Sequence, residues 1–103
     1  MILATIIAAL VGISLTVLVI KLLGWQRIKD WFVGYFKNRH KIKNPDEIAF
    51  TLKENLANNK VKVVQGIFNQ TTDKIEDGLQ YEAEKLDDTL SEYHKNEQVV
   101  VYQ

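Results

Sequence analysis

The sequence contains no cysteine, only one proline and only two histidines among its 103 residues. The absence of cysteine excludes a disulfide framework, a cysteine-ligated zinc site and thiol catalysis. The length leaves room for one small domain. The function must therefore be sought in the apolar and charged side chains.

Charged side chains are absent from the first twenty positions. Over the whole chain 13 Lys and Arg residues balance 13 Asp and Glu residues, but their distribution is uneven. Residues 1–43 carry seven basic side chains and one acid, whereas residues 44–103 carry six lysines and twelve acids. The sequence therefore divides into an apolar, basic N-terminal part and an acidic C-terminal part.

The uncharged run at residues 2–20 has the length of a membrane-spanning helix. At about 1.5 Å per residue such a helix is roughly 28 Å long, close to the hydrocarbon thickness of a bilayer. We therefore predict a transmembrane helix over residues 1–24. A cleaved signal peptide is disfavoured because no basic residue precedes the run and no small-x-small cleavage site follows it. A buried core helix is disfavoured because too few other residues remain to cover it.

The basic residues of this N-terminal part all follow the run, and they are Lys21, Arg27, Lys29, Lys37, Arg39, Lys41 and Lys43. Basic residues close to a transmembrane helix stay on the cytoplasmic side. We therefore expect a cytoplasmic (inner) membrane protein that spans the membrane once, with its N-terminus outside and its C-terminal domain in the cytoplasm. The excess of Lys over Arg favours a bacterial source with an AT-rich genome.

Small residues recur every four positions in the predicted transmembrane helix, at Ala4, Ala8, Gly12 and Thr16. Such a stripe lets two helix backbones approach closely, so it predicts a packing face for a second copy or for another membrane helix. The alternative is that small residues are simply common in membrane helices.

An amphipathic, basic juxtamembrane segment is predicted at residues 25–43. Six apolar and aromatic side chains share one side of a helical wheel, and they are Trp25, Ile28, Trp31, Phe32, Tyr35 and Phe36. An aromatic face of this kind is typical of a helix that lies in the membrane interface. The alternative is that these aromatic residues form the core of the C-terminal domain.

Four basic residues follow at alternate positions, Lys37, Arg39, Lys41 and Lys43. They are expected to contact anionic lipid, each gaining about 1 kcal/mol near an anionic leaflet. A nucleic-acid partner is disfavoured because the domain behind these residues is acidic.

Residues 44–103 predict a small acidic α+β domain. Asn44, Pro45 and Glu47 match a capped helix start, so a helix is expected over residues 45–57. Strands are predicted at 61–69 and 74–82, followed by a helix from Ala83 to about Asn96 and a last strand at 98–102. The order α-β-β-α-β predicts a three-stranded, mostly antiparallel sheet with helices on one face.

The last strand, with Val99, Val100, Val101 and Tyr102, is predicted at an open sheet edge, where it can pair with another chain. About 60 residues is near the lower limit for a domain that folds alone without disulfides or metal. Both observations favour a homo-oligomer or a membrane protein complex. The alternative is a marginally stable monomer held by its anchor.

The sequence contains no recognisable motif for metal binding, nucleophilic catalysis or phosphate binding. His40 and His94 are far apart in sequence, and neither has a second ligand nearby. Ser14 and Ser91 lack a nucleophile motif, and the scattered glycines form no phosphate-binding loop. We therefore expect no enzyme, no catalytic residue, no metal, no cofactor and no small-molecule substrate.

These observations predict a membrane-anchored protein-interaction module or accessory subunit that presents a small acidic domain at the cytoplasmic membrane surface. Membrane lipid and a protein complex are the expected partners. The alternative is a small membrane-active protein, similar to a holin or a toxin, whose transmembrane helices oligomerise.

Overall fold

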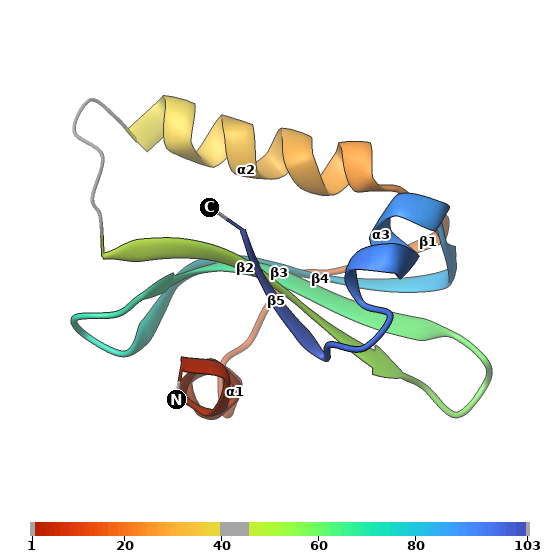
Figure 1. The fold of residues 1–103 in the computed structure, drawn as a ribbon, viewed down its shortest axis with the longest axis horizontal. Coiled ribbons are helices and arrows are strands. Elements are labelled where there is room, and N and C mark those ends of the chain that lie inside the picture. Colours follow the sequence, from red (N-terminus) through yellow and green to blue (C-terminus); the bar gives the residue numbers. More distant parts are fainter. Residues whose placement is uncertain (1, 40–45, 103) are drawn as a thin grey trace.

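The computed structural model describes residues 2–39 and 46–102, which form three helices and five strands (Figure 1). In chain order the elements are α1 (Ile2–Leu10), β1 (Val17–Leu23), α2 (Trp25–Arg39), β2 (Glu47–Asn55), β3 (Val61–Asn69), β4 (Lys74–Leu86), α3 (Asp88–Tyr93) and β5 (Val99–Tyr102).

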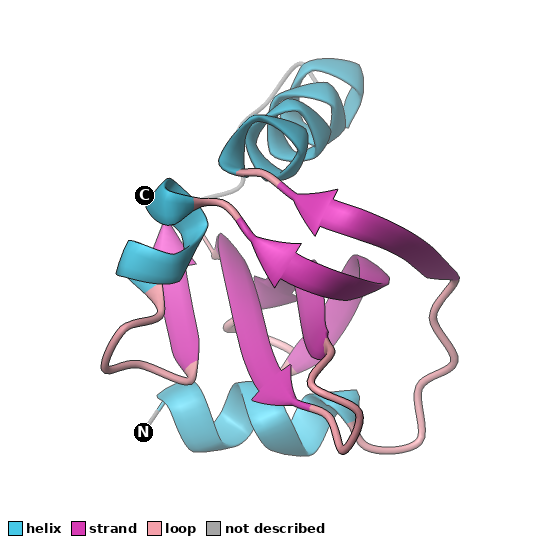
Figure 2. Cartoon of the chain, turned by 90° about the vertical axis from the view of Figure 1, so that its right-hand side faces the viewer, coloured by secondary structure: helices cyan, strands magenta, loops and turns pink. Residues whose placement is uncertain are grey.

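The strands form one mixed sheet in the order β1-β4-β3-β2-β5. β2, β3 and β4 are an antiparallel meander, β5 lies antiparallel to β2, and β1 lies parallel to β4. β1 and β5 are therefore the two edges of the sheet. Helices α2 and α3 lie on one face, here called the α2 face, and α1 lies on the opposite face, the α1 face (Figures 1 and 2).

The α2 face carries the larger of two apolar cores. Ile28 and Phe32 of α2 are both buried, because residues four apart share one side of a helix. The buried members of this core are Leu23, Ile28, Phe32, Ala49, Val63, Ile67, Tyr81, Ala83, Leu86 and Leu90. α2 is thus held by its apolar side against the centre of the sheet.

The α1 face carries the smaller core, beneath the middle strands. Ile6 of α1 is fully buried, and it joins Phe50 and Leu52 of β2 with Val64 and Phe68 of β3. These strand residues alternate with those that face α2, because successive side chains of a strand point to opposite faces. One short helix therefore covers the central part of this face.

Gly66 of β3 lies where the α1 face leaves no room for a side chain. A Cβ atom at this position would lie 2.9 Å from the carbonyl oxygen of Asp77 and 3.0 Å from the ring of Phe50. Glycine therefore allows the Phe50 ring to pack directly against the backbone of β3.

The predicted transmembrane helix is wrong. Among residues 2–39 and 46–102, no helix is both long and apolar enough to cross a membrane. The uncharged run instead forms α1, a turn and β1, because Gly12 has a left-handed φ of 83° beyond the end of α1. The β-branched residues that follow favour a strand. The predicted fold class, a single-pass helix plus a cytoplasmic domain, is therefore wrong as well, and so is the predicted location in the inner membrane.

The helix predicted over residues 45–57 is the strand β2. Ile48, Leu52 and Leu56 match a helical spacing, but Ile48, Phe50 and Leu52 also match the two-residue alternation of a strand. The structure uses the second pattern, with Phe50 and Leu52 buried on the α1 face. The proposed capping residues Asn44 and Pro45 lie outside the described residues.

The predicted three-stranded sheet has five strands, and helices lie on both of its faces. Strands do lie at the predicted positions 61–69 and 74–82, and the second continues to Leu86. The helix expected from Ala83 therefore begins later, where Asp87 accepts a hydrogen bond from the backbone N–H of Leu90 as an N-cap. The last strand lies beside β2, which the sequence had indicated as a helix.

Candidate protein-interaction surface

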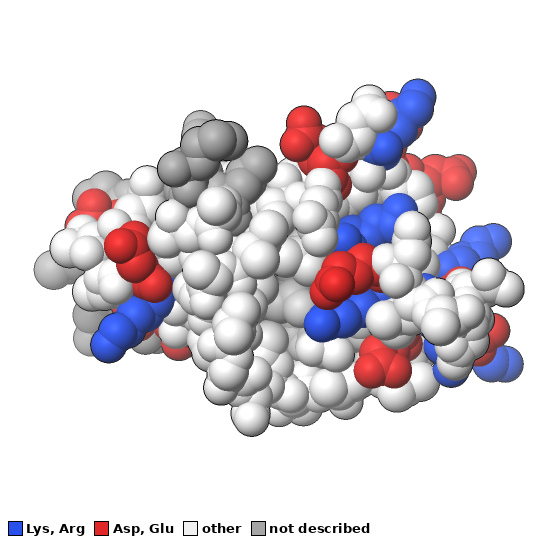
Figure 3. Space-filling model, turned by 90° about the horizontal axis from the view of Figure 1, so that it is seen from below, with Lys and Arg blue, Asp and Glu red and all other residues white. Residues whose placement is uncertain are grey.

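Large apolar side chains are exposed mainly in one part of the chain. Among the residues whose exposure the structure describes, the exposed ones are Ile7, Val11, Ile13, Val17, Val19, Leu22, Val33, Phe36 and Tyr93. The first six belong to α1, to the loop at residues 11–16 and to β1, and together they are here called the α1–β1 surface. Seen from the side of α1, the molecule shows a broad uncharged band between charged ends (Figure 3).

The members of this surface gather at the β1 edge of the sheet. α1 crosses beneath the strands from the β5 edge towards the β1 edge, and the loop then rises to the start of β1 (Figure 2). Ile6 points into the core, whereas its neighbour Ile7 is 40% exposed and Val11 is 79% exposed. α1 therefore packs one side on the sheet, while Ile7 on the helix and Val11 just after its end stay partly exposed to solvent.

β1 also leaves backbone groups without a partner strand. Its one neighbour among the described strands is β4, and the carbonyl of Thr16 accepts a hydrogen bond from the N–H of Gln80 at 2.9 Å. Backbone groups alternate in direction along a strand, so Leu18 also faces β4 while Val17 and Val19 direct their N–H and C=O groups to the free edge. This surface thus combines apolar side chains with open hydrogen-bonding groups.

β5, the opposite edge, is less exposed. The N–H of Lys53 donates to the carbonyl of Gln98 at 2.9 Å, which leaves the backbone groups of Val99 and Val101 facing outward. The side chain of Val99 is nevertheless buried, and Val101 packs against the α1-face core. The predicted pairing of this edge with another chain stays a prediction.

Seven aromatic rings lie in one cluster between α2, α3 and β5. Neighbouring ring centroids are 5.0 to 6.0 Å apart. The cluster consists of Trp25, Trp31, Phe32, Tyr35, Phe36, Tyr93 and Tyr102. Five of the six residues predicted at a membrane interface (Trp25, Ile28, Trp31, Phe32 and Tyr35) pack in the α2-face core, and Phe36 is 39% exposed. This arrangement corresponds to the alternative, in which the aromatic residues form the core of the domain.

A buried hydrogen-bond chain links α3 to both β2 and β5. His94 Nδ1 lies 2.9 Å from the carbonyl oxygen of Glu97, and because a carbonyl only accepts, Nδ1 carries the proton. In the neutral ring Nε2 then accepts from the hydroxyl of Thr51 at 2.7 Å. The phenol of Tyr102 donates to the same Thr51 oxygen at 2.6 Å. The donor of each of these three hydrogen bonds is thereby assigned.

Burial shifts the pKa values of two members of this hydrogen-bond chain, His94 and Tyr102. It lowers the pKa of His94, the hydrogen bond to the Glu97 carbonyl opposes that effect, and the positive charge of Lys53 adds to it. Burial also raises the pKa of Tyr102 to about 12, against the opposing hydrogen bond with Thr51. His94 is therefore a neutral structural residue whose two ring nitrogens are both occupied.

A second buried chain fixes α2 to the sheet. The phenol of Tyr81 donates to Gln65 Oε1, and Gln65 Nε2 donates to the carbonyl of Ile28 at 3.2 Å. Burial raises the pKa of Tyr81, and the charge of Arg27 opposes this. These polar groups stabilise the α2 face through a specific alignment of helix and strands.

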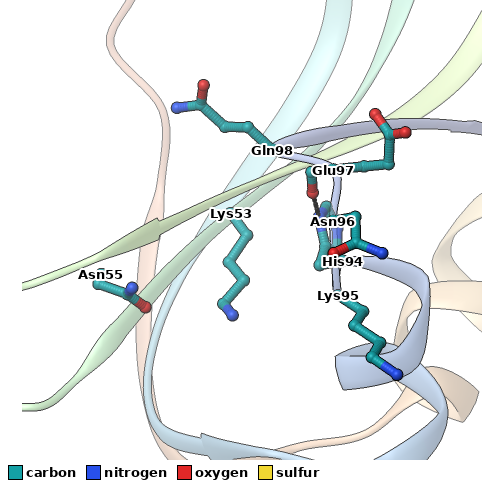
Figure 4. Close-up of a pocket in the computed structure, with 7 residues that line it drawn as sticks. All are labelled: Lys53, Asn55, His94, Lys95, Asn96, Glu97 and Gln98. Carbon is teal, nitrogen blue, oxygen red and sulfur yellow. Dashed lines mark hydrogen bonds between the residues drawn. The ribbon is translucent and has the colours of Figure 1, made fainter.

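A hollow at the start of β5 is open and polar and has a volume of about 360 Å³. It is lined by Lys53, Asn55, His94, Lys95, Asn96, Glu97 and Gln98 (Figure 4). The side chains of Lys53 and Lys95 extend in one direction in this view, and the Glu97 carboxylate extends in the other. Within the described ranges, no three His, Cys, Asp or Glu side chains lie together as a metal site. The hollow thus offers no free imidazole for catalysis.

The predicted helix-packing residues do not share one helix. Ala4 and Ala8 are exposed on α1, whereas Gly12 and Thr16 lie in the loop that follows. The lipid contacts predicted for Lys37, Arg39, Lys41 and Lys43 stay predictions, and the last two residues lie outside the described ranges. Sequence reasoning missed the exposed residues of β1. The available sign was Gly12 followed by the β-branched residues Thr16, Val17, Val19 and Ile20.

No protein-family model matches the chain, and neither the curated proteins nor the solved structures that were searched contain a similar one.

Proposed function

We propose that this chain is a protein-interaction module that binds another protein molecule through the α1–β1 surface. The observation that carries the proposal is the concentration of six exposed large apolar side chains between residues 7 and 22, beside the free edge of β1. Contiguous exposed apolar patches mark binding sites. Natural proteins also protect edge strands with charge, proline or bulges, and β1 has Lys21 as its only charged side chain.

The chemistry of the surface favours a protein over other ligands. Lys and Arg are absent from the first twenty residues, so α1 and the loop that follows it carry none of the positive charge that binds nucleic acid. The described hollow of about 360 Å³ is open and polar, unlike the enclosed, mostly apolar pocket that binds small molecules. A catalytic role has no support from these residues.

The second hypothesis, a membrane-active protein with associating helices, loses its main support. It relied on one helix face with Ala4, Ala8, Gly12 and Thr16. α1 ends at Leu10, so Gly12 and Thr16 are outside the helix.

Photocrosslinking tests this proposal. Benzoylphenylalanine is placed at Val19, which is 68% exposed, or at Val33 of α2, which is 54% exposed and serves as the control. After irradiation of the chain in an extract of its source cells, we expect discrete protein adducts, including adducts to a second copy, from position 19 and none from position 33. Equal adduct patterns at both positions, or no adduct at position 19, would contradict the proposal.

A further inference from the structure

We infer that the partner of the α1–β1 surface is a second copy of this chain, which pairs with it through β1 in an antiparallel arrangement centred on Val19. This inference rests on the proposed function, because it names the occupant of the same surface. The two five-stranded sheets then continue into each other across a twofold axis.

The backbone of β1 determines the register. Thr16 and Leu18 face β4, so Val17 and Val19 direct their backbone groups outward. Lys21 is the one residue of β1 without a β4 partner in the register, and the proposed pairing places it at the free edge. A twofold axis at Val19 pairs Val19 with its copy and Val17 with Lys21 of the second copy. Every outward residue of the strand then has a partner.

The two neighbouring registers would form fewer backbone hydrogen bonds between the two β1 strands. An axis at Ile20 places Val17 opposite Leu23, whose carbonyl already accepts from the N–H of Asp87. An axis at Leu18 places Lys21 opposite a residue of the loop, beyond the end of the strand. The register centred on Val19 therefore makes the most inter-strand hydrogen bonds.

Charge also favours a second copy. Lys21 is the only charged residue of β1, and the Val19 register places it opposite Val17 rather than opposite the other Lys21. Like charges directly opposite each other destabilise a strand pair. An apolar, uncharged surface fits this one best, and residues 1–20 of a second copy carry no charged side chain. The chain carries that complementary surface itself.

The proposed pairing covers side chains of β1 that are exposed in the single chain, those of Val17 and Val19. Leu18 and Ile20 pack against the α2-face core, so Val17 and Val19 project on the α1 face. In the twofold pair the valines of both copies form one row between the two α1 helices. β5 offers no such row, because Val99 is already buried in its own chain.

Sedimentation velocity of the purified chain tests the pairing. We expect a dimer at micromolar concentration and a dissociation constant at least roughly tenfold weaker for Val19→Lys, because two ammonium groups then face each other. Val33→Lys introduces the same charge at an exposed site on α2 and should leave the dimer unchanged. Circular dichroism of both variants confirms that they remain folded. A chain that stays monomeric up to high micromolar concentration overturns the inference.

Disulfide crosslinking of single-cysteine variants can determine the register, since the chain has no cysteine of its own. Paired residues at Val19 have Cα atoms about 5.5 Å apart, within reach of a disulfide. Val19→Cys should therefore form a crosslinked dimer on mild oxidation. Val17→Cys should not, because its copy lies about 13 Å away along the strand, but it should crosslink when mixed with Lys21→Cys. Crosslinking of Val17→Cys alone overturns this register.

The two proposals fail in different ways. A monomeric chain whose position 19 crosslinks to a different protein overturns the second copy and retains the interaction module. A monomeric chain with no adduct at position 19 overturns both.

Discussion

The two faces of the sheet are built on different principles. On the α2 face, two helices, an aromatic cluster and two buried hydrogen-bond chains fix one arrangement of the elements. On the α1 face, one short apolar helix lies across the strands and leaves the side chains of Val17 and Val19 exposed. Directional polar contacts thus specify the first face, whereas the second retains apolar surface for a partner.

The largest expected effect concerns the contact of α1 with the sheet. Ile6→Ala should lower the free energy of unfolding by about 2–4 kcal/mol, because Ile6 is fully buried among Phe50 and its neighbours. Ile7→Ala, at the adjacent exposed position, should change it by less than about 0.5 kcal/mol. Urea unfolding measures both, in a Val19→Lys background at a concentration where sedimentation shows that variant to be monomeric. Equal effects at the two positions would show that α1 does not pack on the sheet.

The next largest loss of unfolding free energy is expected at the buried hydrogen bond between Tyr81 and Gln65 on the α2 face. Gln65→Leu leaves the buried Tyr81 hydroxyl without its acceptor and should cost about 1–3 kcal/mol of unfolding free energy. Adding Tyr81→Phe removes the orphaned hydroxyl and should restore part of that loss. A double-mutant cycle in urea measures the coupling. Strictly additive losses would show that the two side chains do not act together.

Asp87 joins the beginnings of two helices. Its Oδ1 accepts from the N–H of Leu90, and its Oδ2 accepts from the N–H of Trp25 at 2.9 Å. Asp87→Ala should therefore lower the unfolding free energy by about 1–2 kcal/mol, as the loss of an N-cap does. Asp88→Ala, at an exposed position without such a bond, is the matched control. A similar loss in both variants would argue against the cap.

The smallest effect is the pH dependence from His94. Its pKa is lowered in the folded state, so the unfolded chain binds the proton first as the pH falls. The stability contributed by the neutral ring is complete above about pH 6.5 and is lost as the pH falls below this value. Urea midpoints at pH 7.5 and 5.5 should differ more in the natural chain than in His94→Gln. The same difference in both would exclude His94 as the cause.

Some elements of the fold could be predicted because their residues admit one interpretation. The aromatic side of α2 indicates a helix, and the alternation in 61–69 indicates a strand. What covers each of them depends on elements distant in sequence. Phe32 suits a membrane interface and a protein core equally well, and what covers it here comes from distant elements, among them Tyr102 of β5.

The prediction for the N-terminal run is wrong for a physical reason. Nineteen uncharged residues satisfy the length of a membrane helix, and a single helix of this kind would have been too apolar for so small a core. Division at Gly12 removes that difficulty, because α1 and β1 each need cover on one side only. The exposure of Val19 could not be predicted at all, since it depends on β1 being an edge strand.

Amide hydrogen exchange along β1 tests most directly that this run forms an edge strand with an open apolar surface. The amides of Leu18 and Ile20 face β4, and they should be protected at every protein concentration. The amides of Val17 and Val19 face the free edge and should gain protection only as the concentration rises and the chains pair. Continuous protection through residues 2–20, as in one unbroken helix, would contradict the account, and so would free exchange at Leu18 and Ile20.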